Sequence, residues 1–421
     1  MTKILSVVGA RPNFMKIAPF VKAIGDFNKV NGDRPIEHTL VHTGQHYDVR
    51  MSESFFRSLG IPDPDINLEV GSGTHSEQVG HTMIGIERVL MEVMPDWLVV
   101  VGDVNATLAC SVAAKKLGIK VCHIEAGLRS GDMSMPEEIN RLVTDRLSDL
   151  LLTPDRMSSE NLRREGVPEK SIVFVGNIMI DTLEQNREKA AALNIMDIIS
   201  GNMIADGNKS GIGDMAGGDV AGGDDGSAGG DVAGGDVAGG DVAGGSSGSG
   251  GLADGYALMT IHRPSNVDAK EVFEPLIMFL LDEVSTRMPL VWPIHPRARK
   301  NLEEFGLWEM VSANPNVLLL EPLGYHEMLR MNMGATIMLT DSGGLQEECC
   351  VLGTPCLTLR WNTERPVTLR EHGGASVLVG NEVARIRKEF LDTLSQEPAP
   401  LRPELWDGNT AARCVEAIMC H

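Results

Sequence analysis

The sequence predicts an α/β protein made of two doubly wound domains that face each other. Short apolar segments rich in β-branched residues alternate with segments of helical periodicity, once before and once after a Gly/Asp-rich stretch. This alternation indicates βαβ units, and therefore parallel sheets covered by helices on both faces. Two such blocks in 421 residues fit two domains better than one.

The first block begins with a buried strand at 4–8, and Pro12 then opens a helix whose apolar residues recur on one face. A second helix is predicted over 106–116. The remaining strands expected in this block lie at 39–42, 97–101 and 120–124. The strands expected in the second block lie at 256–261, 290–294, 317–320, 336–340, 356–359 and 376–379.

The stretch 201–251 differs from both blocks. Glycine makes up 20 of its 51 residues, and the unit Asp-Val-Ala-Gly-Gly recurs from positions 219, 231, 236 and 241. Such a segment cannot bury enough apolar surface to offset the entropy lost on ordering. We therefore predict a disordered, low-complexity insertion.

Charge and composition exclude several classes of partner. With 37 basic and 58 acidic residues the formal net charge is −21, which disfavours nucleic acid and anionic membrane surfaces. The apolar runs at 97–101 and 317–320 are far shorter than the roughly 20 residues of a membrane-spanning helix. The seven cysteines show no CxxC spacing, so we expect reduced thiols and no metal site. The apolar run at the start of the chain is too short for a signal peptide, and we expect a cytoplasmic protein.

Polar side chains follow the predicted strands. In open α/β sheets ligands bind beyond the carboxyl ends of the strands, so these positions are the candidate site. In the first block they are Arg11, Lys16, Gly102, Asp103, Glu125 and Glu137. In the second block they are His262, His295, Asp341 and Ser342.

The segment 341–348 has the character of a pyrophosphate cradle. Gly343 and Gly344 allow the backbone to approach a ligand, and the free amides of the next helix favour a phosphate. Glu348, two turns along, can accept hydrogen bonds from ribose hydroxyls. Arg11, Lys16 and Arg365 can supply the positive charge that a diphosphate requires. The alternative is an ordinary capped turn between a strand and a helix.

Asp103, Glu125, Glu137 and His262 form the candidate acid/base set. Carboxylates placed beside a phosphate site and partly shielded from water are suited to proton abstraction near neutral pH. The alternative is that each has only a structural role.

Nine motifs in order resemble the non-hydrolysing UDP-N-acetylglucosamine 2-epimerases, over nearly the whole chain outside the insertion. The motifs are GARPNFMKIAP (9–19), TGQH (43–46), VGDVNATLA (101–109), HIEAGLRSGD (123–132), PEEINR (136–141), VGNIMID (175–181), TIHRPSN (260–266), TDSGGLQEE (340–348) and NTERP (362–366). Two motifs depart from the family pattern: Asn13 replaces the usual Glu, and Pro264-Ser265 follows His262-Arg263 in place of Arg-Glu.

The resemblance implies a GT-B-like fold of two Rossmann-like domains facing across a cleft. The N-terminal domain would comprise 1–178, and the C-terminal nucleotide-binding domain 179–405 with the insertion at about 201–251. A helix at about 406–421 would pack back on the first domain. The family needs no metal or nicotinamide cofactor, and a homodimer is expected.

The resemblance also implies an activity. The family interconverts UDP-N-acetylglucosamine and UDP-N-acetylmannosamine by anti elimination of UDP and syn re-addition through 2-acetamidoglucal, supplying surface polysaccharide synthesis. By matching motif, Asp103, Glu125, Glu137 and His262 become catalytic. The matching substrate contacts are Arg11, Lys16, Met328, Ser342, Gly343, Gly344, Glu348 and Arg365, together with Asp103, Glu125 and His262.

Three alternatives stay open on the sequence alone. A hydrolysing relative would release N-acetylmannosamine and UDP. An epimerase for another UDP-2-acetamido sugar, including diacetamido uronates, would share every motif. A non-catalytic UDP-sugar sensor would need no acid/base groups, and the presence of all four argues against it.

Overall fold

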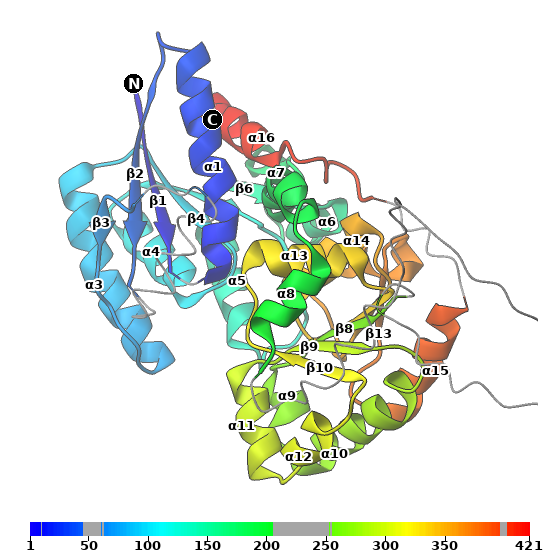
Figure 1. The fold of residues 1–421 in the computed structure, drawn as a ribbon. Helices are drawn as coiled ribbons and strands as arrows, with labels where there is room; N and C mark the ends of the chain where they lie inside the picture. Colours follow the sequence, from blue (N-terminus) through cyan, green and yellow to red (C-terminus); the bar gives the residue numbers. More distant parts are fainter. Residues whose placement is uncertain (10, 45–59, 61–62, 205–251, 253–254, 396–401) are drawn as a thin grey trace, which may run out of the picture.

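The computed structural model describes residues 1–9, 11–44, 60, 63–204, 252, 255–395 and 402–421. Within them the chain forms two parallel sheets with helices on both faces of each, which confirms the predicted fold class (Figure 1). The predicted insertion lies almost entirely outside the described residues. Among the described helices, none is both long and apolar enough to span a membrane.

The first sheet has the strand order β3-β2-β1-β4-β5-β6-β7. Its strands are β1 (Thr2–Val8), β2 (Ile36–His42), β3 (Ile66–Asn67), β4 (Trp97–Val101), β5 (Lys120–Ile124), β6 (Leu150–Thr153) and β7 (Ile172–Phe174). The accompanying helices are α1 (Arg11–Val30), α3 (His75–Val93), α4 (Asn105–Lys116), α5 (Pro136–Leu147) and α6 (Arg156–Arg164).

Alternation along β1 explains why both faces of this sheet are covered. Ile4 and Val8 lie in one apolar cluster with α1 and the C-terminal helix α16 (Thr410–Cys420), whereas Leu5 and Val7 lie in another with α3 and α4. Successive side chains of a strand point to opposite faces, so a strand with buried apolar side chains on both faces needs a helical layer on each side.

The second sheet has the order β10-β9-β8-β11-β12-β13. Its strands are β8 (Ala257–Thr260), β9 (Leu290–Pro293), β10 (Val317–Leu320), β11 (Ile337–Thr340), β12 (Cys356–Thr358) and β13 (Ser376–Leu378). The helices are α8 (Ile195–Asn202), α9 (Pro264–Val267), α10 (Lys270–Phe279), α11 (Pro296–Glu304), α12 (Trp308–Ser312), α13 (Tyr325–Gly334), α14 (Gly343–Leu352) and α15 (Val383–Leu394).

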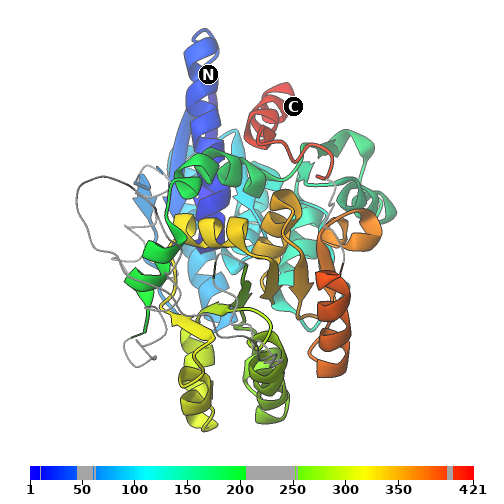
Figure 2. The same ribbon diagram turned by 45° about the vertical axis from the view of Figure 1, so that its right-hand side comes forward.

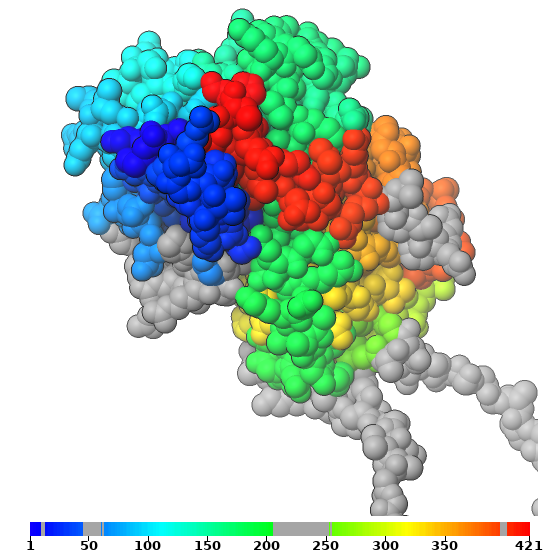
Figure 3. Space-filling view, turned by 90° about the horizontal axis from the view of Figure 1, so that it is seen from above, coloured from blue at the N-terminus to red at the C-terminus, as the bar shows by residue number. Residues whose placement is uncertain are grey.

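Helix α7 (Ile178–Ala191) joins the two sheets, because it packs on α1 and α16 of the first and on α13 and α14 of the second (Figure 2). The chain returns to the first sheet through Trp406, which is buried and donates from Nε1 to the Pro154 carbonyl at 2.9 Å. Helix α16 then lies beside α1, as Figure 3 shows. Asp181 of α7 caps α16 by accepting from the backbone N–H groups of Thr410 (3.0 Å) and Ala411 (2.7 Å).

The predicted start of the insertion at Gly201 is too early. Gly201 and Asn202 complete α8, and Met203 pairs with Leu320 at the edge of the second sheet. Ile204 is buried in the apolar cluster of that sheet, and its N–H donates to the Leu319 carbonyl at 3.1 Å. The residues before 205 therefore belong to the fold.

Candidate active site

The candidate residues gather where each sheet reverses its strand order. In the first sheet β1 and β4 are neighbours at the reversal, and in the second sheet β8 and β11 are. In open α/β sheets, ligands bind beyond the carboxyl ends of the strands at such a reversal. Lys16 and Asp103 follow the first pair of strands, and His262 and Ser342 follow the second.

The centre of the first group is an ion pair between Lys16 Nζ and Glu125 Oε2, with both side chains almost completely buried. Glu125 follows β5 directly and has a φ of 70°, a left-handed conformation that is costly for a residue with a Cβ. Among the described residues, nothing within hydrogen-bond distance partners its Oε1. The backbone is thus strained at a position that turns a buried carboxylate toward Lys16.

Gly102 makes this approach possible. It has a φ of 69°, and a Cβ there would lie 3.1 Å from Lys16 Nζ and 3.6 Å from Glu125 Oε2. Asn13, at the position where the family usually has Glu, donates from Nδ2 to the Val101 carbonyl at 2.8 Å. It therefore ties the start of α1 to the end of β4, beside the ion pair.

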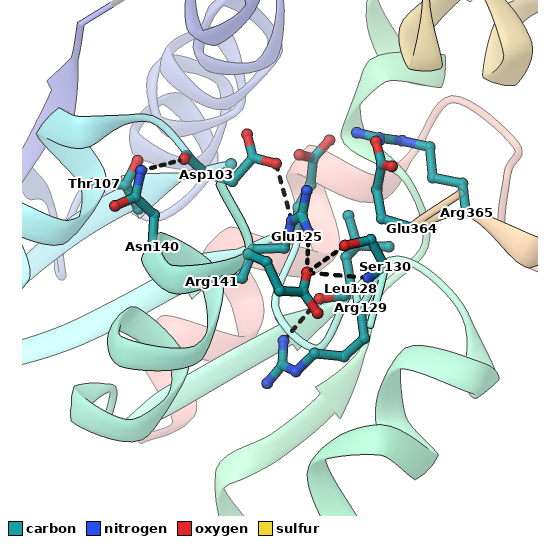
Figure 4. A network of polar contacts seen from close by, with 12 residues as sticks. Asp103, Thr107, Glu125, Leu128, Arg129, Ser130, Asn140, Arg141, Glu364 and Arg365 are labelled. Carbon is teal, nitrogen blue, oxygen red and sulfur yellow. Dashed lines mark hydrogen bonds and ion pairs between the residues drawn. The ribbon is translucent and has the colours of Figure 1, made fainter. Parts of the chain in front are cut away.

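Asp103 lies next to this pair and is held by α5 (Figure 4). Arg141 donates from Nε to Asp103 Oδ2 at 3.0 Å, and Asn140 donates to the Asp103 carbonyl at 2.9 Å. The other side of the Arg141 guanidinium pairs with Glu138, which also accepts from the backbone of Ser130 and Gly131. Asp103 keeps 25% of its side chain exposed, so it is oriented and still accessible.

Glu137 differs from its neighbour Glu138. Glu137 is exposed in the first turn of α5, whereas Glu138 is buried against Arg141. The charge of Glu137 nevertheless acts on a residue that follows β8 of the second sheet, because Glu137 is one of the carboxylates that raise the pKa of Arg263. Burial and the nearby Arg360 lower the pKa of Arg263, which Glu364, Asp341 and Glu137 partly counteract.

His262 is fixed by Asp341. The imidazole Nδ1 lies 2.9 Å from Asp341 Oδ1, and the backbone N–H groups of His262 and Arg263 donate to the same carboxylate. Burial would raise the pKa of Asp341, but the hydrogen bonds and charge of His262 prevail and lower it. Because an ionised carboxylate only accepts, Nδ1 carries the hydrogen and Nε2 stays available for proton transfer.

The N-terminus of α14 faces a second cluster of charges. A Cβ at Gly343 would lie 3.0 Å from both Arg365 Nη1 and Glu364 Oε1, whereas no atom lies within 4 Å of one at Gly344. Ser342 is the N-cap and makes no side-chain cap bond, so its hydroxyl and the first helix amides are available to an anion.

Arg365 is buried between two carboxylates. Its Nε donates to Glu347 Oε1 at 2.5 Å, and its Nη1 pairs with Glu364. Burial would raise the pKa of Glu364, but Arg365, Arg360 and Arg141 hold it far below its usual range. The charges of Glu125 and Asp103 also act on Arg365, so the two sheets share one electrostatic environment.

Glu348 is buried beside Glu347, and burial together with the Glu347 charge raises the pKa of Glu348 to about 8. Met328, on α13, packs against the apolar cluster that contains Tyr256 and Met331, and no described contact connects it to the charged groups. The side chain of Arg11 lies outside the described part of the structure.

Several charged groups of this site were not selected as site residues from the sequence. They are Glu138, Arg141, Glu347, Arg360 and Glu364. Each lies within five residues of a residue that was selected, and Arg141 ends the motif that contains Glu137. Adjacency was the available signal, but only the fold shows which of two neighbouring carboxyls is buried.

Comparison with known proteins places the chain among sugar-nucleotide enzymes. A family model described as UDP-N-acetylglucosamine 2-epimerase matches residues 28–205 and 247–419. A UDP-N-acetylglucosamine 2-epimerase of Methanocaldococcus jannaschii is 37% identical over 388 residues, covering 92% of this chain and 90% of that protein. A UDP-2,3-diacetamido-2,3-dideoxy-D-glucuronate 2-epimerase of Pseudomonas aeruginosa is 37% identical over 383 residues, covering 90% and 88%.

Solved structures of UDP-GlcNAc 2-epimerases are similar to the chain as well. The Methanocaldococcus jannaschii UDP-GlcNAc 2-epimerase in complex with UDP-GlcNAc and UDP superposes with a TM-score of 0.79 at 34% identity, with full coverage of both chains. The Neisseria meningitidis UDP-GlcNAc 2-epimerase bound to UDP-GlcNAc gives a TM-score of 0.77 at 26% identity, also with full coverage.

Replacing Gly102 by Ala should destabilise the protein more than replacing Gly118. Both glycines have left-handed φ angles and share a backbone cost of about 1 kcal/mol. The new Cβ at 102 must also displace Lys16, whereas no atom lies within 4 Å of one at 118, so we expect a further loss of about 1–3 kcal/mol for Gly102→Ala. Thermal unfolding of the two variants measures the difference, and equal losses would contradict the packing described for Gly102.

Proposed function

The chain belongs to the UDP-N-acetylglucosamine 2-epimerase family, and we propose that it interconverts UDP-N-acetylglucosamine and UDP-N-acetylmannosamine by the non-hydrolysing route. The observation that carries this proposal is that two unlike groups lie close enough to share one electrostatic environment. Carboxylates with restricted access to water lie at the end of the first sheet, and a buried Arg with a free helix N-terminus lies at the end of the second.

The proposed reaction needs both groups. A base removes the C2 proton while the C1–O bond breaks, so that UDP leaves with the bonding electron pair and 2-acetamidoglucal forms. UDP then attacks C1 again, and an acid delivers a proton to the opposite face of C2. Negative charge grows on UDP as the bond breaks, and fixed cations and helix amides stabilise it.

We assign the proton transfers to Asp103, Glu125, Glu137 and His262 as a group. The diphosphate and ribose contacts are assigned to Arg11, Lys16, Ser342, Gly343, Gly344, Glu348 and Arg365, with Met328 toward the base. The accessible carboxylate of Asp103 and the free Nε2 of His262 support roles at the sugar. A cytoplasmic location is proposed because all seven cysteines are free, which suits a reducing compartment.

A second candidate substrate is a UDP-2,3-diacetamido uronate. The relative that is named for this substrate is as similar to the chain as the relative named for UDP-N-acetylglucosamine, at 37% identity each. The two reactions share the C2 chemistry and differ in the groups at C3 and C5.

Proton NMR of each UDP sugar with the protein in deuterium oxide tests the activity. We expect deuterium at C2 and a mixture of the two epimers for the physiological sugar, because re-addition takes its proton from solvent. Steady release of free N-acetylmannosamine would contradict the non-hydrolysing route, and no exchange with either sugar would contradict the epimerase.

Removing single carboxylates should separate chemistry from binding. We expect Asp103→Asn and Glu125→Gln to lower turnover by at least about 100-fold while UDP affinity stays within a few-fold. Asp26→Asn, at an exposed position on α1, is the control and should keep full turnover. Unchanged turnover in either carboxylate variant would remove that residue from the mechanism.

We further propose a homodimer that covers α3. Ile84, Met91 and Met94 are 55%, 60% and 64% exposed along this helix and its C-cap, and exposed apolar side chains close together favour association. The double variant Ile84→Glu/Met91→Glu should shift the mass measured by light scattering from dimer to monomer. Leu391→Glu, on α15, should leave it unchanged, and an unaltered mass for the double variant would place any interface elsewhere.

A further inference from the structure

Glu347 occupies a distinctive position in the site without lying among its proposed substrate contacts. It is 2% exposed in the second turn of α14. Its Oε1 accepts from Arg365 Nε at 2.5 Å and from Asn177 Nδ2 at 2.9 Å. Among the described residues, its Oε2 has no hydrogen-bond partner. Oε1 therefore accepts both hydrogen bonds that position the side chain, and Oε2 can carry a proton.

The surrounding groups carry an excess of negative charge. Ion pairs connect four basic and five acidic side chains at the meeting edges of the sheets, which leaves a net charge of 4 − 5 = −1 when all are ionised. We call them the charge cluster: Lys16, Asp103, Glu125, Glu138, Arg141, Glu347, Arg360, Glu364 and Arg365. The neighbouring Glu348 adds a sixth carboxyl.

A bound diphosphate adds two negative charges to this cluster. Arg365 already faces the carboxylates of Glu347 and Glu364, so its charge is fully compensated before a ligand arrives. After protonation at Glu347 Oε2, Oε1 can still accept from Arg365 and Asn177, although more weakly than a carboxylate oxygen does. The Arg365 guanidinium would then face one ionised carboxylate, that of Glu364, instead of two. The charge of Arg365 would become available to the diphosphate.

We infer that Glu347 takes up a proton when a nucleotide diphosphate sugar binds, and that substrate binding is thereby coupled to the protonation of a carboxyl group that positions Arg365. The inference rests on the proposed function, because it requires the diphosphate to bind between Arg365 and the N-terminus of α14.

The electrostatics of Glu347 agree with this. Burial is the largest cause that raises the pKa of Glu347, to about 7. The charge of Glu125 after β5 adds to the rise, and the charges of Arg365 and Lys16 oppose it. Glu348 and Cys350 on α14 are the other titratable groups that interact with it, and Glu364 shares Arg365. A further negative charge nearby raises the pKa again, so the protonated form prevails in the complex at neutral pH.

Proton uptake on adding UDP-N-acetylglucosamine in weakly buffered solution with a pH indicator tests the inference. Both phosphates of this ligand are esterified and do not titrate near neutral pH, and epimerisation neither consumes nor releases protons. We expect a small uptake at pH 6, where Glu347 is largely protonated before binding, and a larger uptake at pH 8. Linkage then weakens binding as pH rises, by up to about tenfold per pH unit between the free and bound pKa values.

Two matched glutamine variants identify the group. Glu347→Gln keeps a carbonyl oxygen for Arg365 and Asn177, and it should abolish the uptake and flatten the pH dependence of the affinity. Glu348→Gln removes a proposed ribose contact and should weaken binding, but at saturating ligand it should keep the uptake. Loss of uptake in Glu348→Gln but not in Glu347→Gln would overturn the assignment. Glu404→Gln, at an exposed position, serves as a control that should match wild type.

Infrared difference spectra of the wild-type protein provide a measurement that does not depend on any variant folding. A carboxylic-acid C=O band should appear on binding at pH 8. Saturable binding with neither proton uptake nor this band would overturn the inference and leave the epimerase standing. Failure to bind either candidate UDP sugar at any pH would contradict the proposed function, and this inference with it.

Discussion

Charge compensation at the edge where the two sheets meet constrains the whole site. Glu125, Glu138 and Glu364 are buried, and each is paired with a cation: Glu125 with the distant Lys16, and Glu138 and Glu364 with Arg141 and Arg365 of their own segments. Breaking a buried pair by removing one partner typically costs about 3–5 kcal/mol, because the remaining charge is left without compensation. The members of the charge cluster are therefore interdependent, and their positions follow from the strand order that brings the loops together.

This interdependence suits the proposed chemistry. Lys16 and Arg365 are already held in place by carboxylates before a ligand arrives, so they need little reorganisation to meet the charge of a leaving nucleotide. Preorganised charges of this kind contribute more to transition-state stabilisation than mobile ones. The strained backbone at Glu125 fits the same account, since strain at a functional position has to be offset by the surrounding fold.

The sequence predicted the fold where local signals were strong. The apolar strands at 4–8, 97–101 and 120–124 were found because each is β-rich and ends in a polar turn. Strands β6 and β7 were missed because β6 follows α5 almost without a loop and β7 has only three residues. The strand-end rule found Asp103, Glu125 and His262, since it depends on topology. This rule did not select Arg141 or Glu347. A charged residue inside a helix is expected on the solvated surface, and only its neighbours in the fold show that it is buried.

Asn177 connects the charge state of the site to the arrangement of the two sheets. It caps α7, accepting from the Met179 N–H at 3.0 Å, and it also donates to Glu347. Helix α7 packs on both sheets, so this hydrogen bond connects α14 to the helix that joins the two sheets. A carboxylate accepts this hydrogen bond more strongly than a neutral carboxyl does. Protonation of Glu347 therefore weakens the hydrogen bond from Asn177 as it releases charge on Arg365, so substrate binding and this hydrogen bond depend on one titrating group.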